Sequence, residues 1–150
     1  MESLREGLIW WVTVTVMLTC VVCRSPHLHK VGGQSGWTKD VNYTEWASHE
    51  RFYVGDWLLF LFDKHYFNVL EVNKTSYEQC NDRYFITNIT RGGRDVFNLT
   101  QAKPYYFLSS GGYCFNGMKM AISVEEYVDP APAPAPAKNG CQKKTPMPIR

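Results

Sequence analysis

The sequence lacks most of the features by which catalytic and nucleic-acid-binding proteins are recognised. It has no phosphate-cradling glycine-rich loop, no nucleophile-elbow pattern around a serine and no paired histidines at helical spacing. Carboxylates such as Asp56, Asp63 and Glu71 are isolated along the chain. The net charge is only +2, and neither a Lys/Arg cluster nor zinc-finger spacing is present. These absences argue against an enzyme and against a nucleic-acid partner.

Only one long apolar run occurs, and it is short for a membrane span. Leu8 to Cys23 is about sixteen residues long, whereas a bilayer requires about 20. It follows a charged start that includes Arg5, and no stop-transfer pattern comes after it. We therefore predict that residues 1–23 are a signal peptide with an approximate cleavage site, the alternative being a membrane anchor. Residues 24–29 would then form a short N-terminal segment.

Cysteine is scarce once such a signal is removed, because three of the five cysteines remain. Cys80 and Cys114 lie within the region that we expect to fold, and Cys141 lies in the tail. Secretion favours a disulfide between the first two. Cys141 would be free or would pair between chains.

Short apolar or alternating segments separated by turn residues predict an all-β domain over residues 30–128. The run Trp57 to Phe62 has strand length, and Lys119 to Tyr127 alternates its apolar residues as strands do. Further strands are expected near 31–37, 68–72, 85–90, 95–100 and 105–108, with a helical turn at 75–80. About seven to eight short strands without a long amphipathic helix indicate a Greek-key β-sandwich.

Four acceptor sequons for N-glycosylation begin at Asn42, Asn73, Asn88 and Asn98. Asn88 and Asn98 fall within predicted strands, where a sequon can stay unmodified. Beyond the domain, residues 129–150 form an Ala-Pro-rich polar tail, which we expect to be an extended, solvated spacer.

Several motifs occur in a fixed order: Val31-Gly32-Gly33 with Gly36-Trp37, Phe52-Tyr53-Val54-Gly55-Asp56, Asn68-Val69-Leu70-Glu71-Val72, Tyr77 with Cys80, and Tyr106-Phe107 before Cys114 and Gly117-Met118-Lys119. Together they resemble the phytocyanins, the small copper proteins of plants, and specifically the early nodulin-like branch. The resemblance covers about Lys30 to Tyr127 and implies a cupredoxin-like sandwich. The Ala-Pro tail resembles the arabinogalactan-type modules of plant cell-wall proteins.

The resemblance also implies where copper ligands would stand. The family's two histidines and its cysteine thiolate correspond to Phe67, Tyr113 and Leu108, and only the axial position, Met118, is unchanged. A blue-copper centre needs the imidazoles and the thiolate for affinity. We therefore expect no metal and no other cofactor, with the substituted residues filling the former pocket.

The four histidines offer little replacement for the missing copper ligands. His65 precedes Phe67 by two residues and would face the same side of an extended strand. One histidine and one thioether hold Cu(II) poorly. His27, His29 and His49 are expected to be solvated, although His27-x-His29 near a new N-terminus could bind metal adventitiously.

These observations favour a non-catalytic, secreted glycoprotein module that acts in cell-wall or cell-surface recognition, with cell-wall glycans or receptors as partners. Two alternatives remain: an electron carrier with a non-standard ligand set, and a binder of small apolar or phenolic molecules through the Tyr113 hydroxyl. Early nodulin-like proteins usually continue into a hydrophobic tail for a glycolipid anchor. This sequence ends instead in polar and basic residues, from which we expect a soluble secreted chain.

Overall fold

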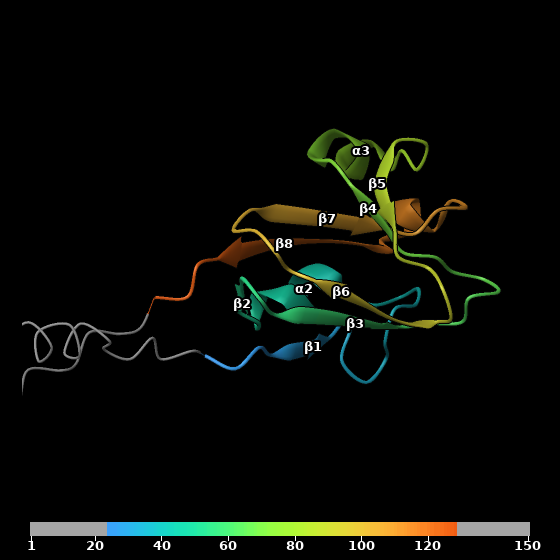
Figure 1. Cartoon of the computed structure of the whole chain (residues 1–150). Helices are drawn as coiled ribbons and strands as arrows, with labels where there is room; N and C mark the ends of the chain where they lie inside the picture. Colours follow the sequence, from blue (N-terminus) through green and yellow to red (C-terminus); the bar gives the residue numbers. More distant parts are fainter. Residues whose placement is uncertain (1–23, 129–150) are drawn as a thin grey trace, which may run out of the picture.

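A computed structural model describes residues 24–128 as two stacked sheets (Figure 1). The expected signal peptide, the Ala-Pro tail and Cys141 lie outside the described residues. The smaller sheet has the strand order β1 (Leu28–Lys30), β3 (Trp57–Leu61) and β6 (Arg94–Asn98). The larger sheet has the order β2 (Phe52–Tyr53), β8 (Lys119–Glu125), β7 (Pro104–Leu108), β4 (Leu70–Val72) and β5 (Phe85–Asn88).

Both sheets are mixed. β1 pairs with β3 and β2 pairs with β8 in parallel, whereas the other pairs are antiparallel. Each short parallel strand lies at one edge of its sheet, so segments far apart in sequence close the sandwich. The predicted β-sandwich of about seven to eight strands with one disulfide is confirmed, since residues 24–128 contain eight strands and the Cys80–Cys114 bond.

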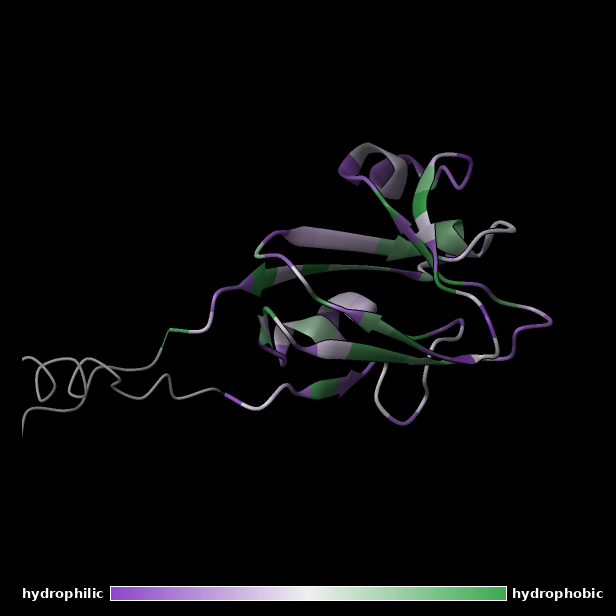
Figure 2. Cartoon of the chain, viewed as in Figure 1, coloured by the Kyte–Doolittle hydropathy of each residue, from purple (hydrophilic) through white to green (hydrophobic). Residues whose placement is uncertain are grey.

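Apolar side chains at alternate positions along the strands form the core between the sheets. β8 buries Met120, Ile122 and Val124, as the sequence pattern predicts. β7 places Tyr105 and Phe107 in the main apolar cluster, between the sheets. Tyr106 and Leu108, the alternate side chains of β7, belong to a second, smaller cluster on the other face of the larger sheet. This second cluster is built from Leu70, Val72, Leu108 and Cys114. In Figure 2, green segments, which mark apolar residues, accordingly occur in strands of both sheets.

Strand and helix boundaries differ from the prediction in places. β1 begins at Leu28, so the segment 24–29 takes part in the folded domain, and β4 begins at Leu70, two residues later than expected. A helix that the sequence pattern did not predict, α2 (Tyr43–Ser48), begins after Asn42, whose side chain accepts a hydrogen bond from the Glu45 N–H. α3 (Lys74–Gln79) matches the expected helical turn within one residue.

Two turns depend on particular residues. At Gly36 the backbone has φ of +71°, and a Cβ would lie 2.5 Å from the carbonyl oxygen of Leu61, so only glycine fits. The predicted turn at 91–94 is held by Asp95, whose carboxylate accepts hydrogen bonds from the N–H groups of Arg91, Gly92 and Gly93. Burial alone would raise the pKa of Asp95, but these donors outweigh it and the pKa is lowered.

The disulfide Cys80–Cys114 joins the end of α3 to the short helix η1 (Tyr113–Asn116) across 34 residues of sequence. Closing such a loop restricts the unfolded chain, so Cys80→Ala/Cys114→Ala should lower the free energy of unfolding by about 3 kcal/mol in urea. Cys141→Ala is the control and should leave the midpoint unchanged. An equal effect in both variants would refute the expectation.

Candidate functional site

Three of the four residues at the expected copper position lie together at one end of the sandwich. Phe67 and Tyr113 are partly buried and pack against the main cluster, which includes Met118. The two rings meet edge to face, with centroids 4.9 Å apart and an interplanar angle of 76°. Met118 is only 1% exposed. This contact joins the loop before β4 to the loop after β7.

Asn68 fastens the same two loops by hydrogen bonds. Its backbone N–H donates to the Ser109 hydroxyl at 3.3 Å, and its side-chain oxygen accepts from the Ser110 N–H at 2.8 Å. Its amide nitrogen donates to the Ser110 hydroxyl at 2.6 Å, and its carbonyl oxygen accepts from the Trp37 indole at 2.9 Å. These hydrogen bonds therefore hold the two loops together.

Leu108 lies apart from the other three. It is fully buried in the second cluster, with Leu70, Val72 and Cys114. Side chains alternate along a strand, so the residue after Leu108, rather than Leu108 itself, continues the face of Tyr105 and Phe107.

That next residue is Ser109, which is also fully buried. Its hydroxyl accepts a hydrogen bond from the backbone of Asn68, the residue next to Phe67, and its own N–H donates to the Met118 carbonyl at 3.1 Å. Counting back five residues from Tyr113 identifies Leu108, but Ser109, directly after β7, is the residue that bonds to Asn68 beside Phe67 and to Met118.

The expectation that His65 lies on an extended strand is wrong. The Asp63 carboxylate accepts a hydrogen bond from the His65 N–H, and the Asp63 carbonyl accepts from Tyr66 and Phe67, which closes a turn. His65 is exposed on that turn.

The residues at this position do not fit a copper ion. Phe67 and Leu108 offer no donor atom. Ser109 offers a hydroxyl where a thiolate is needed, and Tyr113 offers a hydroxyl where an imidazole is needed. Met118 supplies a single weak thioether. Within residues 24–128, no group of three or more His, Cys, Asp or Glu side chains is arranged to hold a metal ion.

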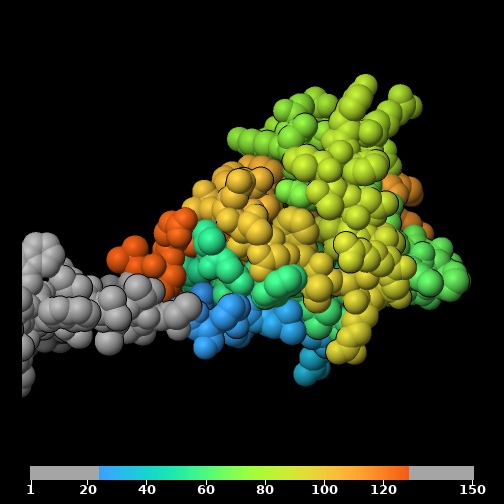
Figure 3. Space-filling view, viewed as in Figure 1, coloured from blue at the N-terminus to red at the C-terminus, as the bar shows by residue number. Residues whose placement is uncertain are grey.

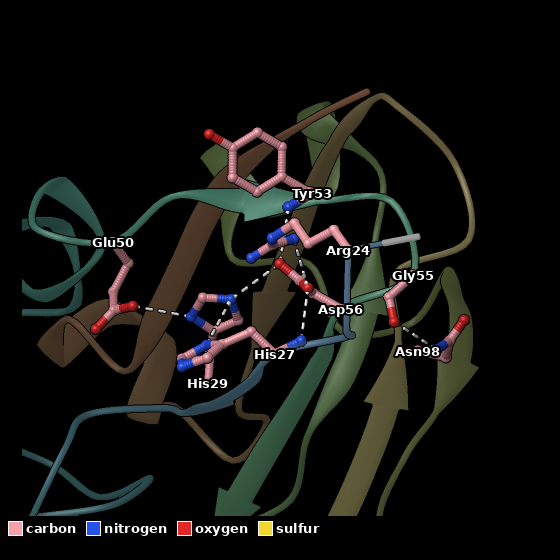
Figure 4. A network of polar contacts seen from close by, with 8 residues as sticks. All are labelled: Arg24, His27, His29, Glu50, Tyr53, Gly55, Asp56 and Asn98. Carbon is pink, nitrogen blue, oxygen red and sulfur yellow. Dashed lines mark hydrogen bonds and ion pairs between the residues drawn. The ribbon is translucent and has the colours of Figure 1, made fainter. Parts of the chain in front are cut away.

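A network of polar contacts lies elsewhere, around Asp56, which directly precedes β3 (Figure 4). Its side chain is fully buried. One carboxylate oxygen accepts from the Arg24 guanidinium at 2.9 Å and the His27 N–H at 2.8 Å. The other accepts from the Tyr53 N–H at 3.0 Å and meets the His29 ring at 3.2 Å. Asp56 thus ties the N-terminal segment to the β2–β3 turn.

His29 lies between two carboxylates, and the expectation that it is solvated is wrong. It is only 4% exposed, with Nδ1 at 2.8 Å from Glu50 and Nε2 at 3.2 Å from Asp56. Figure 4 shows the ring between these two groups. A neutral imidazole donates from one nitrogen only, so both contacts are hydrogen bonds only in the imidazolium form. His27 and His49 are exposed, although the His27 ring approaches His29 Nε2 at 3.3 Å.

Burial by itself would raise the pKa of Asp56, because it disfavours the charged carboxylate. Hydrogen bonds from the backbone of His27 and Tyr53 and from the side chains of His29 and Arg24 outweigh burial, and the pKa is lowered. The Arg24 guanidinium also lies 4.5 Å from the centre of the Tyr53 ring and 5.3 Å from that of Tyr127. This cluster is a structural anchor for the first described residues.

A family model for a plastocyanin-like domain matches residues 37–118, which is more than half of the chain. Early nodulin-like protein 20 of Arabidopsis thaliana is 51% identical over 138 residues, covering 91% of this chain and 82% of that protein. The chain belongs to the early nodulin-like phytocyanins.

Similarity to copper-named relatives is lower but covers as much of the sequence. Blue copper protein 1a of Medicago truncatula is 33% identical to this early nodulin-like phytocyanin, over 93% of its chain and 85% of the relative. A solved structure of cucumber stellacyanin with Cu²⁺ is 30% identical and superimposes with a TM-score of 0.61, covering 70% of this chain and all of that one.

Within residues 24–128 of this phytocyanin, no helix has the length and apolarity to cross a membrane.

Proposed function

We propose that this early nodulin-like phytocyanin is a secreted, non-catalytic glycoprotein module that does not hold type 1 copper and acts in recognition at the cell wall or cell surface. The observation that carries the proposal is the contact of Phe67 with Tyr113 beside Met118, at the position where the family resemblance implies copper. The apolar run at residues 8–23, the four sequons and the Ala-Pro tail support the extracellular location.

In this proposal, packing and hydrogen bonds, instead of a metal, stabilise the end of the sandwich at the expected copper position. Full burial of a phenylalanine or leucine side chain contributes about 1.5–3 kcal/mol. Leu108 is fully buried and Phe67 partly so, and the substituted residues can therefore replace part of the stabilisation that a metal would give. Asn68 bonds to both Ser109 and Ser110, which fixes the loops without a ligand. A rigid sandwich end of this kind can present a surface to a glycan or a receptor protein.

Copper titration of the secreted, disulfide-intact protein tests the proposal. With one equivalent of Cu(II), followed by gel filtration, we expect no strong visible charge-transfer band and no retained copper, because no thiolate or imidazole is in place. A copper-binding phytocyanin treated in the same way is the positive control. One retained copper per chain with a strong band would instead support an electron carrier with an unusual ligand set, and His65 and Met118 would then be replaced first.

The small-ligand alternative has less support at this position, because Phe67, Tyr113 and Met118 are packed together there. A groove of about 310 Å³ lies on another part of the domain, between α2 and β8, and its lining includes Glu50, Phe52 and Ile122. Glu50 already bonds to His29. A thermal shift with small phenolic compounds that Tyr113→Phe abolishes would favour this alternative.

A further inference from the structure

The edge of the larger sheet carries an exposed apolar strand. β5 is the last strand in the order β2-β8-β7-β4-β5, and all four of its residues are exposed. Phe85 is 48% exposed and Ile86 is 59% exposed, while Tyr84 just before the strand is 72% exposed. Figure 3 shows this yellow-green part of the chain at the surface. An uncovered apolar edge is a site for unwanted strand pairing, so natural proteins usually cover or interrupt it.

Asn88, the last residue of β5, begins one of the four sequons. Its side-chain oxygen accepts a hydrogen bond from the Thr90 N–H at 3.0 Å. Its amide nitrogen, the atom to which an N-linked sugar is attached, makes no hydrogen bond within the described residues. Asn98 differs, because it is half-buried and its amide nitrogen donates to the Gly55 carbonyl at 3.5 Å.

The strand register places Phe85 and Asn88 on one face. Asn88 pairs with Leu70 and Phe85 pairs with Val72, and an irregularity leaves Ile86 as the extra residue. Leu70 and Val72 share a face, since both belong to the second cluster. Directly opposed residues of antiparallel strands point to the same side, so Phe85 and Asn88 do so as well.

We propose that Asn88 is glycosylated and that the first N-acetylglucosamine packs on the Phe85 ring, covering the β5 edge. Aromatic faces carry negative charge density, and the C–H groups on one side of a pyranose carry a weak positive charge, so the two surfaces attract each other as well as excluding water. The modification requires passage through the secretory pathway, and in this respect the inference rests on the proposed function.

Among the four sequons, Asn88 alone has an aromatic residue three positions earlier. Leu70 precedes Asn73 at that distance, Lys39 precedes Asn42, and Asp95 precedes Asn98. Asn73 therefore provides a matched control: it is exposed, and its side-chain oxygen accepts the Ser76 N–H, but Leu70 is buried and cannot stack on its sugar.

The test combines glycopeptide mass spectrometry with a double-mutant cycle on the full chain secreted from a eukaryotic host. The cycle compares wild type, Phe85→Val, Asn88→Asp and the double variant. Valine preserves strand preference, and Asp keeps the oxygen that accepts the Thr90 N–H. We expect Asn88 to be occupied, and the glycan to raise the Tm by several degrees when Phe85 is present and by much less when valine replaces it. Trimming the Asn88 glycan to a single N-acetylglucosamine should preserve this coupling in Tm. In the control cycle, Asn73→Asp and Phe85→Val should change the Tm independently of each other.

Each other outcome overturns the inference in an identifiable way. Sugar at Asn42 or Asn73 with none at Asn88 overturns the site while leaving secretion intact. An occupied Asn88 without coupling to Phe85 overturns the packing. An unmodified Asn88 in a protein that elutes as a dimer assigns the edge to a second copy of the chain. Absence of sugar at all four sequons also overturns the glycoprotein part of the proposed function, whereas the copper titration tests the metal-free site separately.

Discussion

The triple variant Phe67→His/Ser109→Cys/Tyr113→His should bind one Cu(II) per chain and show a strong visible charge-transfer band. Phe67 contacts Tyr113, Ser109 bonds to Asn68 next to Phe67, and Met118 is already present as the weak axial ligand. Two imidazoles and a thiolate with an axial thioether are the donor set of a blue-copper centre. Visible absorption and metal analysis after gel filtration measure the result.

Copper should also stabilise the triple variant, because a ligand bound only by the folded state at 100 times its Kd adds about 2.7 kcal/mol. Without copper the variant should be less stable than the wild type, since polar rings replace apolar packing at the cluster. The Cys80–Cys114 disulfide must be verified by mass spectrometry, because a third thiol in the domain could exchange with it.

The matched control moves the thiol by one residue. Phe67→His/Leu108→Cys/Tyr113→His has the same added groups, but its cysteine lies in the second cluster with Leu70 and Val72. We expect this variant to remain colourless. Colour with cysteine at position 108 and none at position 109 would show that spacing along the sequence, rather than the side of β7, determines the ligand position.

Much of the fold could be predicted because it depends on local patterns. The apolar run beginning at Trp57 and the alternation along β8 indicate strands by themselves, and two cysteines within a domain that the sequence predicts to be secreted indicate a disulfide. The helix α2 was missed because its six residues depend on the Asn42 cap and on tertiary packing against β8, not on an amphipathic repeat.

The polar interior could not be predicted in the same way. Asp56 is isolated in the sequence, and its partners Arg24 and His29 come from a segment about thirty residues earlier that reaches it only through the parallel pairing of β1 with β3. The one available signal was Gly55-Asp56 directly before an apolar strand, which marks a turn but does not identify partners. Ser109 was missed for a related reason: the face on which a residue lies is determined by strand pairing, not by its distance from the next motif.

Asp56→Ala should lower the free energy of unfolding by about 3–5 kcal/mol, because it leaves an arginine, a histidine and two backbone N–H groups without their buried acceptor. This is a large fraction of the 5–15 kcal/mol that a domain typically has. Urea unfolding at pH 7 measures the loss. Asp63→Ala is the control: its carboxylate is exposed and accepts the His65 N–H, so a loss of about 1 kcal/mol or less is expected. Equal losses in the two variants would mean that the cluster does not anchor the fold.

The pH dependence separates the charge of Asp56 from its packing. The pKa of Asp56 is lowered in the folded state, so its ionisation stabilises the fold above the unfolded-state pKa of about 3.9, and this contribution is lost as the pH falls through the lower folded-state value. The facing groups Arg24, His27, His29 and Glu50 remain present in Asp56→Asn, which lacks only the carboxylate charge. The difference in unfolding free energy between wild type and Asp56→Asn should therefore be largest near neutral pH and should narrow as the pH falls below about 4. A difference that stays constant down to pH 2 would assign the effect of Asp56 to shape and hydrogen bonding, not to its charge.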